Sequence, residues 1–323
     1  MKRFKNIVYI ANEPGIGSVA FQNALELAIS NNAELTVLDV IEPMVWSAEN
    51  QARFGMDLTT ILRDRRLDEL SALTIPHCND NFLIKTQVAV GTPFLEIIRA
   101  TLRNRFDLVI KNAEKMPGQF SSTLGPNDQH LVRKCPCPVW IDREQTSHPY
   151  QKILAAVDPL GDEDKSMSRM IMDLALSVEP TGESEVHVVH AWRVAGESSL
   201  STGRGHIPGI HVDQILAAQE HRHLVALASL VEEYGMRVSD PNVHFEKSDA
   251  TALITRISRE LPADLLVTGT VGRTGIPGFF IGNTAESLMH MLDIPVLTVK
   301  PKGFVSPVTL THGSFTSTRA GSA

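Results

Sequence analysis

The chain has 323 residues, enough for two domains of about 150 residues each. Its 43% hydrophobic and 21% charged residues are typical of a globular protein, and a net charge of −7 does not favour a nucleic-acid partner. No apolar run reaches the roughly 18 residues of a membrane span, and the run at 7–11 is too short for a signal peptide. Three cysteines cannot build a secreted disulfide framework, so we expect a cytoplasmic protein.

In chain order, short β-branched runs alternate with segments whose apolar residues recur at helical spacing, and the whole alternation occurs twice. The first half contains five predicted strands, near 7–11, 35–40, 83–90, 108–111 and 139–141. The second half contains five more, near 153–157, 184–190, 243–247, 265–268 and 296–299. Its predicted helices lie near 165–178, 212–235, 250–260 and 284–292.

The two halves also resemble each other in sequence, which indicates an internal repeat. Three pairs of segments match: 4–14 with 150–160, 33–40 with 184–191, and 106–113 with 263–270. The spacing downstream is the same in both halves, because 31 residues separate Asp107 from Pro138 and Asp264 from Pro295. The simplest interpretation is two copies of one module.

Alternating strands and helices imply crossover connections, and therefore a parallel sheet with helices on both faces. We predict an α/β protein with two tandem doubly wound domains, each a five-stranded parallel sheet in the order 3-2-1-4-5. The predicted domains span 1–146 and 147–302, and the small polar residues of 303–323 predict a disordered tail. Each domain ends in an apolar edge strand, so we expect the two to pack through these strands as a pseudo-dimer.

The stretch GTVGRTGIPGFFIGNTAES, residues 269–287, follows a predicted strand and contains five glycines. Gly269, Gly272 and Gly282 are spaced G-x2-G-x9-G, and Gly282 directly precedes a predicted helix. Glycine lets the backbone approach a ligand closely, and a helix N-terminus favours a phosphate. The spacing therefore indicates a nucleotide-phosphate site, while the alternative that these glycines only form a long loop stays open.

Asp158 follows the first strand of the second half. In a 3-2-1-4-5 sheet the first and fourth strands are neighbours, so Asp158 and Gly269 would face the same crevice. A carboxylate there can accept hydrogen bonds from a ribose or a base. The alternative is a solvated turn residue in the sequence DPLGDED.

This combination of glycine spacing, strand pattern and Asp158 resembles the universal stress protein family, and the tandem arrangement is similar to its two-domain E-type members. The resemblance covers about residues 3–302 and implies a fold related to adenine nucleotide α-hydrolases, with ATP, and Mg²⁺ as its companion ion, as the candidate ligand. Carried over by position, the implied nucleotide-binding residues are Val157, Asp158, Val189, Gly269, Gly272, Arg273, Gly282, Asn283 and Thr284. The chain departs from the family at Asn283, where ATP-binding members usually carry Ser or Thr.

The first half lacks the glycine pattern. Asn112 and Lys115 stand where the second half has glycines, and Pro126 stands at the position of Asn283. Only Gly125 is retained, and proline has no N–H group to offer a phosphate. We expect the first half to fold in the same way without binding a nucleotide.

Three functions stay open from the sequence. The leading hypothesis is a non-catalytic stress-response regulator that binds ATP in its second domain and acts on an unidentified protein partner, with a homodimer as a further candidate. The alternative is a carrier of an apolar ligand, lined by 275–282 and by the loop 198–209. The third is an ATP-using enzyme of the wider superfamily.

The sequence assigns no catalytic or metal-binding residues. His187 and His190 lie three apart on a predicted strand and therefore point to opposite faces. Cys135 and Cys137 have neither the spacing of a thioredoxin-type motif nor that of a normal disulfide, so we expect small buried side chains.

Overall fold

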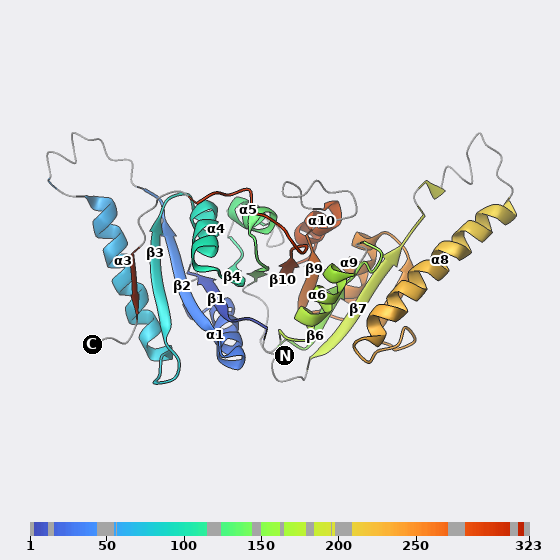
Figure 1. The fold of residues 1–323 in the computed structure, drawn as a ribbon, viewed down its shortest axis with the longest axis horizontal. Helices are drawn as coiled ribbons and strands as arrows, with labels where there is room; N and C mark the ends of the chain where they lie inside the picture. Colours follow the sequence, from blue (N-terminus) through green and yellow to red (C-terminus); the bar gives the residue numbers. More distant parts are fainter. Residues whose placement is uncertain are drawn as a thin grey trace.

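The computed structural model describes residues 3–11, 16–43, 55, 57–114, 124–143, 150–161, 165–178, 184–194, 196–197, 209–270, 282–310 and 316–319. Within these residues one sheet of eleven strands runs through the whole molecule, with helices on both faces (Figure 1). The predicted boundary between residues 146 and 147 lies outside the described residues.

The first half forms a parallel sheet in the order β3-β2-β1-β4-β5. Its strands are β1 (Asn6–Ile10), β2 (Glu34–Ile41), β3 (Ile84–Val90), β4 (Leu108–Asn112) and β5 (Val139–Asp142). Its helices are α1 (Val19–Asn31), α3 (Leu58–Thr74), α4 (Pro93–Asn104) and α5 (Pro126–Lys134), and the short 3₁₀ turn η1 (Ile75–His77) follows α3. Proline at the first position of α4 and of α5 favours the start of each helix, since its missing N–H has no partner there in any case.

The second half repeats this order as β10-β9-β6-β7-β8. Its strands are β6 (Lys152–Ala156), β7 (Glu185–Trp192), β8 (Val243–Lys247), β9 (Leu265–Gly269) and β10 (Val296–Val299). Its helices are α6 (Ser166–Ala175), α8 (Gly209–Glu232), α9 (Ala250–Glu260) and α10 (Asn283–Met291). The predicted fold class, two α/β halves each ordered 3-2-1-4-5, is confirmed.

The two halves meet through their last strands, as the sequence predicts. β5 and β10 pair antiparallel, with Val296 opposite Ile141 and Thr298 opposite Val139. The Thr298 hydroxyl donates a hydrogen bond to the Val139 carbonyl at 3.0 Å. Both strands are fully buried, so the junction covers two edges that would otherwise expose apolar residues and free backbone groups.

Each face of this sheet carries one apolar core that continues across the junction. One core includes Tyr9, Trp140, Ile153 and Leu297, and the other includes Val8, Ile141, Leu154 and Val296. Neighbouring residues of one strand fall into different cores because successive side chains point to opposite faces. The halves therefore share their cores as well as their sheet.

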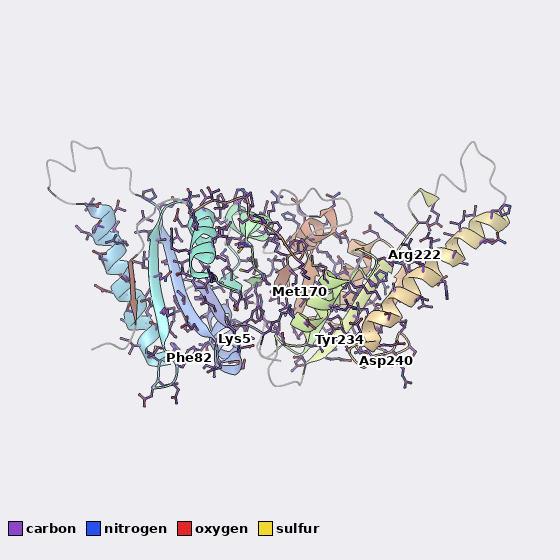
Figure 2. The ribbon with its side chains drawn as sticks, in the orientation of Figure 1. Lys5, Phe82, Met170, Arg222, Tyr234 and Asp240 are labelled. Carbon is purple, nitrogen blue, oxygen red and sulfur yellow. The ribbon has the colours of Figure 1, made fainter. Side chains whose placement is uncertain are left out.

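The long helix α8 meets the rest of the second half only along part of its length. The Tyr234 hydroxyl, just beyond its C-terminal end, donates to the Asp173 carboxylate of α6 at 2.8 Å. In Figure 2, Met170 and Tyr234 lie where α6 and the end of α8 meet, whereas Arg222 lies farther out along α8. Among the helices of the described residues, none combines the length and apolar character that a membrane crossing requires.

The C-terminal tail corrects one expectation. The sequence predicts a disordered segment over 303–323, but Thr316–Arg319 forms β11, which pairs antiparallel with β3. Thr316 lies opposite Val88, so the end of the chain returns to the far edge of the first half (Figure 1). Backbone pairing needs no particular side chain, which explains how this short polar segment forms a strand.

The buried junction predicts how a separated second half should behave. A fragment of residues 150–302 would expose the apolar strand β10, so we expect it to dimerise through that strand or to aggregate. Size-exclusion chromatography with light scattering measures the outcome. A fragment that stays monomeric with a cooperative thermal transition would contradict this expectation.

Candidate functional site

The predicted site residues that the structure describes lie around the carboxyl ends of β6 and β9. These two strands are parallel neighbours, with Ala156 opposite Thr268, so their carboxyl ends open at the same edge of the sheet. The Val157 N–H donates to the Val189 carbonyl at 3.0 Å, which ties the end of β6 to β7. Both valine side chains are buried. Val189 belongs to the core beneath α9, and its backbone is the part that reaches the site.

Asp158 anchors a tight turn at this edge. The Gly161 N–H donates to the Asp158 carbonyl at 2.8 Å, and a Cβ at position 161 would lie 3.1 Å from a carboxylate oxygen of Asp158. The carboxylate therefore lies close to the glycine, and Asp158 is half-buried at this edge of the sheet. Both interpretations of Asp158, the turn residue and the ligand-facing carboxylate, are compatible with this position.

The glycine at the end of β9 has a packing role. A Cβ on Gly269 would lie 3.3 Å from the Met167 side chain, so a larger residue would push against α6. The next residue, Thr270, donates both its N–H and its hydroxyl to the Val299 carbonyl. The Gly282 N–H in turn donates to the Thr270 carbonyl at 2.7 Å, which brings the start of α10 back to the end of β9. Gly272 and Arg273 lie outside the described residues.

The start of α10 has the properties of an anion site. Gly282 is the N-cap residue, and it has no side chain with which to cap the helix. Asn283 and Thr284 are exposed, so the first free N–H groups and the positive end of the helix dipole face outward. The acidic residue of the first turn, Glu286, forms an ion pair with Arg133 at 2.6 Å, which reduces its repulsion of an anion.

The equivalent helix start in the first half is occupied by a carboxylate of the chain itself. The Glu114 carboxylate accepts hydrogen bonds from the Asn127 N–H at 3.0 Å and from the Asn127 side-chain amide. The Glu114 side chain occupies the space that a Cβ at Gly125 would take, so a larger residue at 125 would displace Glu114. Asp128 accepts from the Glu114 N–H at 2.8 Å and forms a buried ion pair with Lys111. Glu114 therefore holds the place that a phosphate would take.

The second half carries none of these charges. At the repeat offset of 157 residues, Lys111, Glu114 and Asp128 correspond to Thr268, Val271 and Ala285. The start of α5 is thus closed by an internal anion, whereas α10 has no acidic residue at these positions. The two helix starts therefore differ in the charge that lies over them.

In the first half, a hydrogen-bonded network of side chains occupies the corresponding edge of the sheet. The Asn112 amide donates to the Tyr9 hydroxyl at 3.1 Å and to the Ser18 hydroxyl at 3.0 Å. Burial raises the pKa of Tyr9 to about 12, so the phenol stays neutral within this network. The second half has Ala155 and Gly269 at the positions of Tyr9 and Asn112, which leaves those positions small.

A buried histidine pair beside the site was not predicted. His190 Nδ1 lies 3.0 Å from the Val157 carbonyl, and its Nε2 lies 2.9 Å from Nδ1 of His223 on α8. A carbonyl only accepts, so His190 Nδ1 donates; in a neutral ring its Nε2 then accepts from His223. The two histidines are 33 residues apart in the sequence. Their contact becomes evident only from the packing of α8 against β7.

The first half satisfies the equivalent carbonyl in another way. Arg66 of α3 donates to the Ala11 carbonyl at 3.4 Å and pairs with Asp39 at 2.6 Å. Ala11 and Asp39 occupy the repeat positions of Val157 and His190. An ion pair in the first half is therefore replaced by a pair of hydrogen-bonded histidines in the second. Among the described residues no group of three or more His, Cys, Asp or Glu side chains could hold a metal ion.

The histidine pair predicts a measurable effect on stability. Changing His190 to phenylalanine keeps an aromatic ring against Phe245 but removes both hydrogen bonds. We expect the free energy of unfolding to fall by about 1–3 kcal/mol, since each bond contributes roughly 0.5–1.5 kcal/mol. Chemical denaturation measures the change. The exposed His211 on α8 is the control, since His211→Phe should stay within about 0.5 kcal/mol; equal effects of the two changes would contradict the expectation.

These features define a two-domain α/β protein with one closed and one open helix start at the carboxyl ends of its strands. A sequence model of the universal stress protein family matches residues 3–143 and 149–300. The chain therefore belongs to the universal stress protein family.

Individual relatives agree with this assignment. The chain is 31% identical over 221 residues to Universal stress protein E of Escherichia coli strain K12, covering 68% of each chain. It is 24% identical over 312 residues to the Universal stress protein E homolog of Haemophilus influenzae, covering 93% of this chain and 98% of that one. Among solved structures it is similar to PA1789 from Pseudomonas aeruginosa PAO1, described as functionally unknown, with a TM-score of 0.67, 26% identity and 94% and 95% coverage.

Proposed function

We propose that this protein binds an adenine nucleotide, ATP, in its second domain and acts as a non-catalytic regulator whose contact with a protein partner depends on nucleotide occupancy. The observation that carries this proposal is the contrast between the two helix starts. At α5 the Glu114 carboxylate already accepts the N–H groups, whereas the start of α10 has exposed polar residues and no capping side chain.

The proposed nucleotide site uses the residues carried over from the family resemblance. The backbone of Val157 and Val189 and the Asp158 carboxylate would face the adenosine. Gly269, Gly272, Arg273, Gly282, Asn283 and Thr284 would surround the ribose and the phosphates. Since the Gly282 N–H already donates to Thr270, the N–H groups of Asn283 and Thr284 would be the ones that receive a phosphate oxygen. Mg²⁺ would bind with the phosphates of ATP.

The domain organisation and location belong to the same proposal. The first domain, 1–146, would serve as a structural copy, and the second domain, 147–302, would carry the site. A cytoplasmic location fits a chain with three free thiols. No step of ATP hydrolysis is part of this proposal.

Titration calorimetry of the full chain with ATP, ADP and AMP tests the proposal. We expect one nucleotide per chain, because the first helix start is blocked by Glu114. Two equivalent sites would contradict this assignment of the first half. Native mass spectrometry of the freshly purified protein provides a second measurement, and an apolar molecule in place of a nucleotide would favour the carrier function instead.

A further inference from the structure

Two cysteine thiols lie side by side at the junction of the two halves. Cys135 follows α5 directly and Cys137 lies two residues before β5, with Pro136 between them. Their sulfur atoms are 3.6 Å apart, and both residues belong to the core that crosses the junction. A disulfide needs a separation of about 2.05 Å, so the two sulfurs are in contact without being bonded.

A buried lysine from the other half of the chain lies near the two thiols. Lys300 follows β10 and is only 5% exposed. Its ammonium donates to the carbonyls of Val132 and Arg133 in the last turn of α5. Among the ion pairs of the described residues, none joins Lys300 to a carboxylate. A buried cation is costly without an opposite charge, and the groups near Lys300 that can become anions are the two thiols.

The pKa values of the two thiols are shifted in opposite directions. Burial opposes the charge on Cys135, but the Cys137 hydrogen bond and the Lys300 charge outweigh it and lower the pKa of Cys135. The hydrogen bond to Cys135, together with burial, raises the pKa of Cys137 well above its usual range. Burial also lowers the pKa of Lys300 to about 8. These shifts make Cys135 the more acidic of the two thiols, and a hydrogen bond from Cys137 stabilises its thiolate form.

We propose that Cys135 and Cys137 are an oxidant-responsive dithiol that closes to a disulfide on reaction with a hydroperoxide, with Lys300 stabilising the reactive thiolate. The contact distance, the division of roles and the lysine without a carboxylate carry this proposal together. It is independent of nucleotide binding, since the thiols lie at the C-terminal end of α5 and the candidate site lies at the start of α10.

The chemistry balances with hydrogen peroxide as the oxidant. The Cys135 thiolate attacks one oxygen, the O–O bond breaks, and the hydroxide that leaves takes up the proton that Cys135 had released, forming water. The Cys137 sulfur then attacks the sulfur of the Cys135 sulfenic acid. The S–O bond breaks, the S–S bond forms, and the departing hydroxide takes the Cys137 proton as a second water. Two thiols lose two electrons, which reduce one peroxide to two waters.

Disulfide formation would act on the contact between the halves. It removes the thiols that can offer Lys300 a negative charge, so the buried ammonium keeps only neutral partners, two carbonyls and the Phe304 ring. The last turn of α5 is also held by the Ser306 hydroxyl, which donates to the Lys134 carbonyl at 2.7 Å. Both contacts join the first half to the segment after β10. Oxidation therefore weakens one of several connections between the halves.

Peroxide treatment of the folded full chain tests this proposal. After treatment, free thiols are alkylated and the peptides are identified by mass spectrometry with and without reduction. We expect an intramolecular Cys135–Cys137 disulfide to form at least about tenfold faster than Cys78 oxidises, although Cys78 is the more exposed thiol. Oxidation of Cys78 while the pair stays reduced would overturn the proposal.

Variants assign the roles of the three residues. Cys137→Ser should leave Cys135 as a sulfenic acid that dimedone traps, and Cys135→Ser should leave Cys137 unreactive. Lys300→Met should slow disulfide formation by about tenfold, the effect of one pKa unit on the thiolate fraction, while the exposed neighbour Lys302→Met should not. An unchanged rate in folded Lys300→Met would exclude the proposed role of Lys300. If Lys300→Met does not fold, dimedone labelling of Cys137→Ser is the deciding measurement. The absence of an adduct on Cys135 would then overturn the proposed dithiol.

Discussion

Replacing Asp128 with alanine is expected to lower the free energy of unfolding by about 3–5 kcal/mol, because it leaves the Lys111 ammonium buried without its partner. The side chains of Lys111 and Asp128 are 2% and 0% exposed, so water cannot replace the lost carboxylate. The change also removes the acceptor of the Glu114 N–H. Urea denaturation followed by circular dichroism measures the effect.

The repeat supplies a matched control for this change. The second half has threonine and alanine at the positions of Lys111 and Asp128. The double variant Lys111→Thr/Asp128→Ala removes both charges together, so we expect it to be more stable than Asp128→Ala alone. If the double variant is less stable than the single one, the buried charge on Lys111 is not the source of the loss.

Replacing Asn283 with aspartate is expected to weaken ATP binding by about a hundredfold, equivalent to roughly 2.8 kcal/mol. A carboxylate about 4 Å from a phosphate charge costs roughly 4 kcal/mol at an effective dielectric constant of 20. The change places a carboxylate at the start of α10, as Glu114 does from another position at the start of α5. Titration calorimetry measures the affinity.

The same change should act on folding in the opposite direction. Asn283 is the first residue of α10 and is exposed, so an aspartate there should stabilise the helix by about 0.3–1 kcal/mol through the helix dipole. Asn283→Ser, which installs the usual family residue, is the control and should retain binding. If Asn283→Asp binds ATP as tightly as the unchanged protein, the phosphates do not lie at the start of α10.

The strands were predictable because their signals are local. β-branched runs between turn residues predicted the ten strands of the repeat within about two residues, and the repeat itself predicted the pairing of β5 with β10. β11 was not predictable in this way. Its residues, TSTR, carry no apolar alternation, and its position depends on the free edge of β3 rather than on its own sequence.

The site was predictable only in part, for a similar reason. Glycine spacing and Asp158 pointed to the edge where β6 and β9 end, and the structure brings those segments together there. The contact of Glu114 with Asn127 and the pairing of His190 with His223 depend on side-chain directions across different elements. A partial signal did exist in the sequence. The three charged residues at 111, 114 and 128 of the first half correspond to uncharged residues at the equivalent repeat positions of the second half.

The strand β11 also limits how chains can associate. It occupies the outer side of β3, while among the described residues no strand pairs with the outer side of β8. The described sheet therefore ends in β11 on one side and in β8 on the other. β11 has only four residues, TSTR, and a strand this short offers a second sheet little to pair with. β11 therefore shields the seven-residue strand β3, which would otherwise be the exposed edge of the first half.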